Sequence, residues 1–263
     1  MSTRLTVTST EQVTPTLRRV WFHSDDLSAF ADSTDTDRYV KLVFPKPGVT
    51  YPEPLDMRTL RDTMPPEDLP TVRTYTALFP DVAAGTVAID FVVHGDEGVA
   101  GPWAAAAQPG DTLLVNGPGG GFRPDETADW HLLVGDEAAV PAIGSALEAV
   151  SDAAVVRVLL LVDSPDHEPP LPERLGAEVT FCHRSTGEEG QLAAAVRALE
   201  WLPGRVQAFV HGEAQEVMHG VRPFLLEERA LPREDVSISG YWRRGDSEEG
   251  FRRWKSRLAG SGR

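Results

Sequence analysis

The chain has 263 residues, of which 41% are hydrophobic and 25% charged, so it is long enough for two compact domains and unlike a disordered protein. Its formal net charge of −15 argues against nonspecific binding to nucleic acids or anionic membranes. The single cysteine, Cys182, excludes an internal disulfide and a cysteine-based metal centre, and we expect a buried, inert thiol. No apolar signal segment or membrane-spanning run is apparent, so we expect a cytoplasmic protein that does not insert into membranes. We also expect a monomer.

The first half of the chain predicts β-strands joined by turns. The runs with alternating or β-rich character are residues 5–8, 16–23, 39–44, 73–79, 86–94 and 112–116. A proline-rich, acidic stretch over 45–70 predicts a long loop with room for a helical turn. Five or six strands at this spacing favour a barrel or a sandwich.

The pattern changes after a glycine-rich linker, 117–121, and a loop, 123–129. Strands are predicted over 130–134, 156–162, 178–183, 206–210 and 236–240. Helices are predicted over 140–150, 192–200, 213–228 and 247–258. This alternation indicates a parallel sheet with helices on its faces. We therefore place one domain in residues 1–122 and a second in 123–263.

The run Arg73-Thr74-Tyr75-Thr76 carries side chains suited to a flat, phosphorylated ligand. On a strand, Arg73 and Tyr75 share one face, and Thr74 and Thr76 share the other. Tyr75 could stack on a flavin ring, Arg73 could pair with a phosphate or ring carbonyl, and Thr76 could donate a hydroxyl to the ring edge. The same four residues also fit a plain amphipathic strand, so alone they do not distinguish a flavin site from an ordinary strand.

The next segment, residues 90–104, runs from a strand through a glycine-rich turn into an alanine-rich helix predicted over 102–108. Proline near the first turn, at Pro102, suits a helix start. Unpaired N–H groups and the positive end of the helix dipole would then suit a pyrophosphate. Loops with two or three glycines are common, so this pattern is weak by itself.

Several short motifs follow one another in a fixed order along nearly the whole chain. They are RTYT at 73–76, DFVVHGDEGVAGPWA at 90–104, QPGD at 108–111, VGDEAAVPAI at 134–143, VHGE at 210–213 and GYWRRG at 240–245. Together they resemble the siderophore-interacting protein family, flavin enzymes related to ferredoxin–NADP reductases. Two departures are visible: Ala77-Leu78 follow Thr76 where members often carry a basic residue, and 45–70 holds no family motif.

The resemblance implies a β + α/β fold, with an N-terminal antiparallel β-barrel that binds FAD and a C-terminal α/β parallel-sheet domain that binds NAD(P)H and ends in a helix. It implies three groups of residues in the FAD site. The flavin ring and its attached chain would contact Arg73, Thr74, Tyr75 and Thr76. The backbone of Asp90, Phe91 and Val92 would line the ring, and His94 would reach the pyrophosphate or adenosine. The phosphates would lie against Gly101, Pro102, Trp103 and Ala104.

In the second domain the resemblance places four residues beside the nicotinamide nucleotide: Asp136, Glu137, Gly212 and Glu213. Ligands of open α/β sheets lie beyond the carboxyl ends of the strands, which agrees with this position. Acids at a helix start can also be plain capping residues. In the final motif, Trp242 could cover the flavin face until nicotinamide displaces it. The neighbouring Tyr241, Arg243 and Arg244 could grip phosphate or form a solvated aromatic cluster.

A bulky, often anionic substrate would require cations against this acidic background. Lys41 matches the family's basic position in its VKLxFP strand, and the final helix adds Arg253, Lys255 and Arg257. The bases of that helix could instead balance Glu248 and Glu249 in solvent. We assign the catalytic positions to Lys41, Arg73, Tyr75 and Thr76, and we expect no metal ligands.

The resemblance thus implies an FAD-dependent ferric-siderophore reductase, which uses NADH or NADPH to reduce Fe(III) in siderophore complexes and releases Fe(II) in the cytoplasm. One alternative is a flavin-dependent NAD(P)H reductase for another acceptor, such as free flavin, a quinone or a partner protein. Another is a non-catalytic siderophore-binding protein. NADH, NADPH and ferredoxin all stay open as donors.

Overall fold

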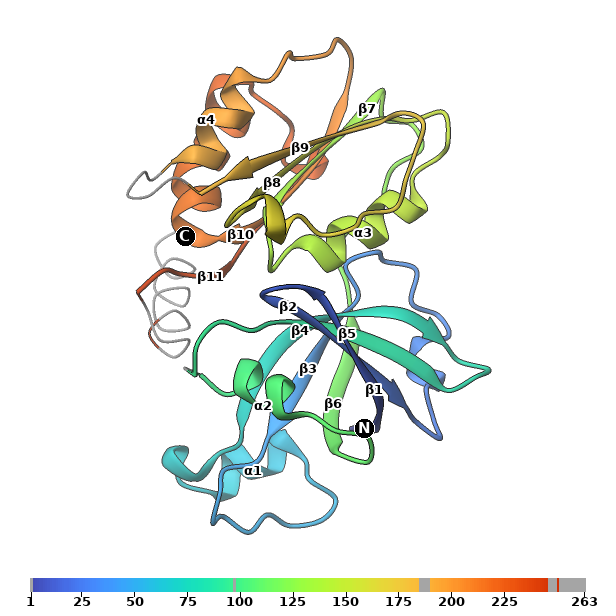
Figure 1. Ribbon diagram of the computed structural model, residues 1–263, viewed down its shortest axis with the longest axis vertical. Coiled ribbons are helices and arrows are strands. Elements are labelled where there is room, and N and C mark those ends of the chain that lie inside the picture. The colour runs from blue at the N-terminus through green and yellow to red at the C-terminus, as the bar shows by residue number, and fades with distance from the viewer. Residues whose placement is uncertain (1, 97, 185–189, 246–249, 251–263) are drawn as a thin grey trace. The chain divides into compact units, whose positions relative to one another are not determined.

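The computed structural model describes residues 2–96, 98–184, 190–245 and 250. It divides into two compact units, Met1–Gly121 and Phe122–Arg263, each described by itself (Figure 1). The helix predicted over 247–258, with Arg253, Lys255 and Arg257, lies outside the described residues except at position 250. No helix within the described ranges is long and apolar enough to cross a membrane.

The first unit is a closed antiparallel barrel with strand order β1-β2-β5-β4-β3-β6, which confirms the predicted fold of this half. Its strands are β1 (Thr3–Thr14), β2 (Leu17–His23), β3 (Tyr39–Phe44), β4 (Thr71–Asp81), β5 (Thr86–Val92) and β6 (Thr112–Gly119). Pairing of β1 with β6 closes the sheet. Closure removes the unpaired edges that an open sheet would leave.

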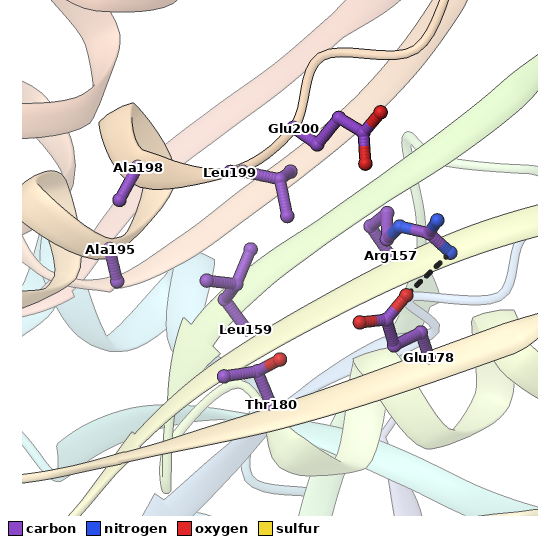
Figure 2. Close-up of a pocket in the computed structure, with 8 residues that line it drawn as sticks. All are labelled: Arg157, Leu159, Glu178, Thr180, Ala195, Ala198, Leu199 and Glu200. Carbon is purple, nitrogen blue, oxygen red and sulfur yellow. Dashed lines mark ion pairs between the residues drawn. The ribbon is translucent and has the colours of Figure 1, made fainter.

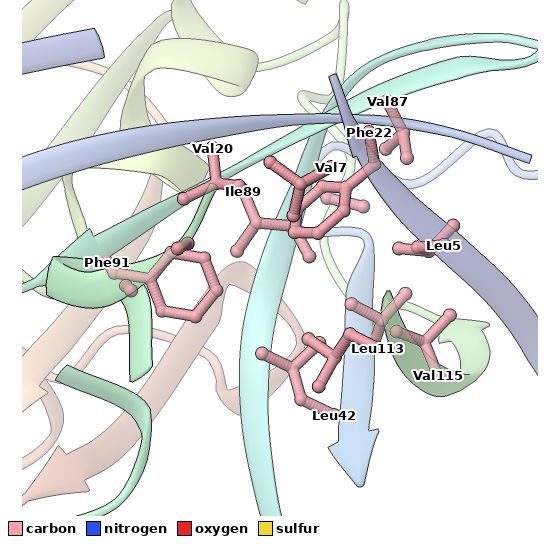
Figure 3. Close-up of a cluster of buried hydrophobic side chains, with 14 of the residues drawn as sticks. Leu5, Val7, Val20, Phe22, Leu42, Val87, Ile89, Phe91, Leu113 and Val115 are labelled. Carbon is pink, nitrogen blue, oxygen red and sulfur yellow. The ribbon is translucent and has the colours of Figure 1, made fainter. Parts of the chain in front are cut away.

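Alternating apolar side chains of the strands fill the interior of this barrel. Val20 and Phe22 of β2 lie opposite Ile89 and Val87 of β5, and all four are fully buried. Figure 3 shows these side chains gathered with Leu5, Leu42, Phe91 and others between the strands. This two-residue alternation is the pattern that the sequence carries.

The glycine-rich run predicted as a linker is partly strand, so that prediction was wrong. Gly119 pairs with Tyr39 of β3, and β6 continues to Gly119. A Cβ atom on Gly119 would lie only 2.5 Å from the Tyr39 ring. The glycine therefore allows close approach of an aromatic ring to a strand, and flexibility is not its role here.

Short helices occupy the connections of the first unit. The stretch over 45–70 contains α1 (Met57–Thr63) and the 3-10 turn η2 (Pro66–Asp68), and η1 (Ser28–Phe30) precedes β3. The carboxylate of Asp56 caps α1 by accepting from the N–H groups of Arg58 and Thr59, both at 3.2 Å. The helix predicted from 102 begins earlier, as α2 (Ala100–Ala106).

The second unit is a parallel five-stranded sheet with order β11-β10-β7-β8-β9, as the sequence predicts. The strands are β7 (Trp130–Asp136), β8 (Val155–Val162), β9 (Ala177–His183), β10 (Val206–Glu213) and β11 (Val236–Trp242). Helix α3 (Val140–Ala149) and helix α4 (Gln191–Ala198) lie on opposite sides of this sheet (Figure 1). Short 3-10 turns, η3 (Pro165–His167) and η6 (Arg233–Asp235), complete the connections.

The chain order reverses in the middle of this sheet. From β7 the chain builds outward through β8 to β9, and it then returns to the other side of β7 to form β10 and β11. The edge of the sheet at the carboxyl ends of β7 and β10 is therefore the topological switch point.

The helix predicted over 213–228 differs in both its start and its type. Glu213 ends β10, where a register shift after Gly212 places it opposite Trp242 of β11. Two π-helical segments follow, η4 (Gln215–Val221) and η5 (Phe224–Glu228).

Cys182 on β9 is half-buried instead of buried, and burial raises the pKa of its thiol. The raised pKa lowers the thiolate fraction, which fits the expected inert thiol.

Candidate functional sites

The first candidate site lies on β4. Arg73 and Tyr75 stand opposite Leu42 and Val40 of β3, whose side chains are in the barrel core. Residues opposite each other on paired strands share a face, so Arg73 and Tyr75 face inward and are half-buried. Thr74 is exposed on the outer face, opposite the exposed Lys41. Lys41 and Tyr75 therefore belong to opposite faces of the sheet.

An aromatic cluster joins Tyr75 to helix α2. The Tyr75 ring centroid lies 4.7 Å from that of Phe91, and the Phe91 centroid lies 5.7 Å from that of Trp103. Trp103 also contacts Phe22 and Phe44, at 6.2 Å and 6.0 Å. Tyr75, Phe91 and Trp103, which the resemblance assigns to one FAD site, thus lie in one cluster. Since Phe91 is fully buried, its side chain supports the Tyr75 ring and leaves only its backbone near a ligand.

Asp90 faces away from this cluster, and its carboxylate is already paired. Arg19 donates from Nε and Nη2 to the two carboxylate oxygens, at 2.7 Å and 2.8 Å. The Arg19 guanidinium also lies 5.1 Å from the centroid of the Phe79 ring. Asp90 is therefore consistent with a backbone contact to a ligand, as predicted. Arg19 escaped the sequence reasoning because its partner is 71 residues away.

The turn between β5 and α2 is open and glycine-dependent. Gly95 and Gly98 take φ of 58° and 81°, in the left-handed region that favours glycine. Val99 precedes the helix and has no polar side chain that could cap its N–H groups. A Cβ atom on Gly101 would lie 3.2 Å from the Val92 carbonyl oxygen. His94 is exposed beside this turn. Backbone N–H groups that no side chain caps fit the phosphate contacts predicted for FAD.

The second candidate site lies at the switch point, where Gly135 allows the chain to turn tightly. A Cβ atom on Gly135 would lie 2.5 Å from the Cβ of Ala139 and 2.7 Å from the carbonyl oxygen of His211. Glycine is thus required for β7 to pass against both α3 and β10.

Asp136 connects three segments at this edge. Its Oδ1 accepts from the Ala138 N–H at 2.9 Å, and its Oδ2 accepts from the Glu213 N–H at 2.7 Å and from the Trp242 indole N–H at 2.8 Å. Burial, followed by repulsion from Glu137, raises the pKa of Asp136 to about 6, against the lowering effect of the Trp242 hydrogen bond. The carboxylate ties together the ends of β7, β10 and β11.

The neighbouring carboxylates are also engaged. Both oxygens of Glu137 accept from Arg184, with Nη2–Oε2 at 2.6 Å, and Arg184 also pairs with Asp163 at 2.7 Å. Glu213 is buried and accepts from the N–H groups of Glu216 at 2.9 Å and Arg244 at 3.1 Å. The hydrogen bonds and ion pairs of these carboxylates fix the edge of the sheet. Because their oxygens are already engaged, a nucleotide bound here would contact mainly the backbone and the neighbouring side chains.

His211 is a residue of this edge that the site prediction left out. It is buried, stacks on Phe209 with ring centroids 3.8 Å apart, and hydrogen-bonds Tyr241 Oη at 2.7 Å and Ser237 Oγ at 2.9 Å. Its partners are 26 and 30 residues away on the adjacent strand, so only strand pairing reveals them.

The structure brings together most of the predicted residues of the second domain. Asp136, Gly212, Glu213, Trp242 and the Arg244 backbone form one network. Their roles toward a nucleotide stay predictions, as do those of the half-buried Arg243 and the exposed Arg244 side chain. Across the described ranges, no three or more His, Cys, Asp or Glu side chains are grouped to hold a metal ion.

A pocket of about 420 Å³ lies elsewhere, between α4 and strands β8 and β9 (Figure 2). Arg157 and Glu178, which pair at 3.0 Å, lie near the starts of their strands, away from the carboxyl edge. None of the predicted site residues lines this pocket.

A closed antiparallel barrel followed by this parallel sheet is the two-domain fold seen in ferredoxin reductases. The solved structure of the ferredoxin reductase in carbazole 1,9a-dioxygenase shares this fold with a TM-score of 0.67 at 18% identity, over 92% of this chain and 70% of that chain.

The family is shown by two models. That of the siderophore-interacting FAD-binding domain matches residues 6–122, and that of the siderophore-interacting protein matches 128–245. The chain therefore belongs to the siderophore-interacting protein family and is an FAD-dependent oxidoreductase.

Three similar proteins support this assignment. An uncharacterized protein of Mycobacterium tuberculosis is 43% identical over 96% of this chain and 94% of its own length. The ferric vibriobactin reductase of Vibrio cholerae serotype O1 is 33% identical over 91% of this chain and 88% of its own length. The crystal structure of a siderophore utilization protein from T. fusca has a TM-score of 0.77 at 35% identity, over 94% of each chain.

Proposed function

We propose that this chain reduces Fe(III) held in a siderophore, with bound FAD as cofactor and NADH or NADPH as electron donor, and that it does so in the cytoplasm. The observation that carries the proposal is the surface formed by Tyr75, Arg73 and the start of α2. It is the arrangement expected of a flavin site, in a chain whose V. cholerae relative is named a ferric vibriobactin reductase.

The residues of the barrel fit FAD in three ways. The half-buried Tyr75 ring rests on Phe91 and keeps part of its surface for a planar ligand. Arg73 offers a guanidinium on the same face as Tyr75, whereas Thr76 is buried on the opposite face of β4. Gly101 has no side chain that would keep phosphates away from the backbone. When bound, FAD supplies the conversion of a two-electron donor into single-electron transfers.

We place the nicotinamide donor at the switch point beyond β7 and β10. There Trp242 would offer an indole face, while Arg243 and Arg244 would attract the donor's phosphates. Asp136 and Glu137, whose oxygens are engaged, would border the nucleotide mainly through their backbone. The buried ends of the strands would keep water from the reacting groups.

We place the ferric siderophore near Lys41, which is exposed on the barrel, with Arg253, Lys255 and Arg257 as further cations outside the described residues. An anionic iron complex would be drawn to these charges. After reduction, Fe(II) carries less charge and is held less tightly by the anionic oxygen ligands, so the metal is released.

The test uses the FAD-loaded protein without oxygen. We expect NADH or NADPH to bleach the flavin absorbance, and a ferric siderophore to restore it with about two Fe(II) trapped per flavin, since each ferric ion takes one electron. Reoxidation by free flavin or a quinone but by no ferric siderophore would identify a reductase for another acceptor. Siderophore binding without oxidation of either nucleotide would identify a binding protein. Failure to take up FAD would overturn the proposal.

A further inference from the structure

We propose that Asp136 is a positioning residue for Trp242: its carboxylate fixes the indole at the end of β11 and so shapes the binding site of the nicotinamide donor. The part that concerns the donor rests on the proposed function. The fixing of the indole itself rests on the structure alone.

The contact between the two residues is direct. The Trp242 indole N–H donates to Oδ2 of Asp136 at 2.8 Å across 106 residues of sequence. Asp136 is fully buried, whereas Trp242 is half-buried. One end of the indole is thus held by a fixed group inside the unit, while part of the ring remains accessible at the edge where sheets of this kind bind ligands.

The backbone around this contact is shaped to permit it. Gly212 takes φ of 151°, and a Cβ atom there would lie 2.8 Å from the same Oδ2. The register shift after Gly212 places Glu213 opposite Trp242, so the Glu213 N–H and the indole N–H both reach that oxygen. A side chain at position 212 would displace the carboxylate from both donors.

The charges around Asp136 explain why it needs these donors. Glu137 repels it, Glu213 lies beside it with its own N–H partners, and Arg184 is shared between Glu137 and Asp163. The ionised carboxylate is stabilised first by the Trp242 indole N–H, then by the charge of Arg184 and by the Glu213 N–H. Hydrogen bonds to an ionised acceptor are roughly twice as strong as neutral ones, so the indole is firmly held.

A held ring lowers the entropic cost of binding a planar ligand against it. We therefore expect Asp136→Asn to raise the KM of the nicotinamide donor about tenfold, the effect of losing one hydrogen bond to a charged group. The anaerobic reduction of a ferric siderophore by dithionite-reduced protein, which bypasses the donor, should keep its wild-type rate.

A double-mutant cycle with Trp242→Phe separates positioning from general structural support. Phenylalanine keeps a ring but has no N–H, so Asp136→Asn should have no further effect on the donor KM in the Trp242→Phe background. If Asp136 acts only by joining β7 to β10 through the Glu213 N–H, the tenfold effect will persist in that background, and the proposal fails. Glu216→Gln is the matched control, because Glu216 is another buried carboxylate with two backbone N–H partners but no contact to Trp242.

A second readout needs neither FAD nor donor. In protein labelled with 15N-tryptophan, the Trp242 indole N–H signal is identified by its loss in Trp242→Phe. We expect its exchange with solvent to accelerate at least about tenfold in Asp136→Asn and to stay unchanged in Glu216→Gln. Unchanged exchange in Asp136→Asn would overturn the inference. If neither nucleotide bleaches the flavin of any variant while exchange accelerates as expected, the proposed donor fails and the fixing of Trp242 stands.

Discussion

At the scale of single residues, the carboxyl edge of the second unit is formed by buried carboxylates. Asp136, Glu137 and Glu213 are each at most 7% exposed, and each accepts from N–H groups or a guanidinium. A buried carboxylate without such partners would destabilise the fold. The edge is therefore rigid before any ligand arrives, which favours a preorganised site.

The pKa of Asp136 gives a prediction for stability. Because burial raises it from 3.8 to about 6, the folded chain holds a proton between about pH 4 and pH 6 that the unfolded chain releases. This group therefore favours folding below that window, and the contribution is lost as the pH rises through 6. Asparagine does not titrate, so the unfolding free energy of Asp136→Asn relative to wild type should rise by roughly 2 kcal/mol from pH 4 to pH 7. Urea unfolding at a series of pH values measures this, and a difference independent of pH would contradict it.

At the scale of elements, close backbone contacts fix how β7 leads into α3. Gly135 lies against Ala139 and the His211 carbonyl, whereas Gly144, within α3, has only Pro172 near its Cβ position, at 3.9 Å. The two glycines are nine positions apart, but only the first is required by packing.

This difference predicts opposite effects of the same substitution. Gly135→Ala should destabilise the protein by about 1–3 kcal/mol, because the new methyl group overlaps neighbours on α3 and β10. Gly144→Ala should stabilise it by up to about 1 kcal/mol, since alanine is the better helix former. Thermal unfolding of both variants tests this. If the two substitutions change the stability equally, the close contacts at Gly135 do not determine the stability of the protein.

Sequence reasoning located elements whose pattern is local. The strand predicted over 39–44 matches β3, because its β-branched and aromatic residues form one local run. The prediction for β1 stopped early, since register shifts after Val7 and Gln12 interrupt the alternation. Residues 117–119 were predicted as a linker because glycine favours turns over strands. In the structure, the pairing of this segment with Tyr39 of β3 outweighs that local preference.

The candidate sites divide in the same way. Tyr75 and Trp103 lie in linear motifs, so the sequence could indicate them. Arg19 and Arg184 could not be found, because their partners lie 71 and 47 residues away and only the folded sheets bring them together. His211 lies in the VHGE motif, but its contact with Tyr241, 30 residues away, could not be predicted. Pairs of this kind need the register of the strands, which composition and periodicity do not contain.

At the scale of the whole molecule, the net charge of −15 opposes the proposed substrate. An anionic iron complex is repelled by the molecule at long range and must be attracted locally. Salt distinguishes the two contributions, since the screening length is about 10 Å at 0.1 M ionic strength.

We expect Lys41→Gln to raise the KM for an anionic ferric siderophore by up to about fivefold at low salt, the effect of one exposed charge pair. The difference should shrink as salt rises, because both attraction and repulsion are screened. Lys46→Gln is the control: it removes the same charge from a half-buried lysine of the same unit, whose Nζ donates to the Glu67 carbonyl. Equal effects of both variants would show that net charge, and not Lys41, governs the encounter.

The π-helical segments η4 and η5 have a consequence for how this family can change in length. Each π turn accommodates about one more residue than an α turn, and Val221, Phe224 and Leu225 reach the core from these segments. Deleting one residue after Glu216 would rotate these apolar side chains by about 100° away from the sheet wherever the type of the helical turn is kept. In evolutionary terms, the segment 215–228 should accept substitutions more readily than gaps, and length differences among relatives should fall in the surface loops.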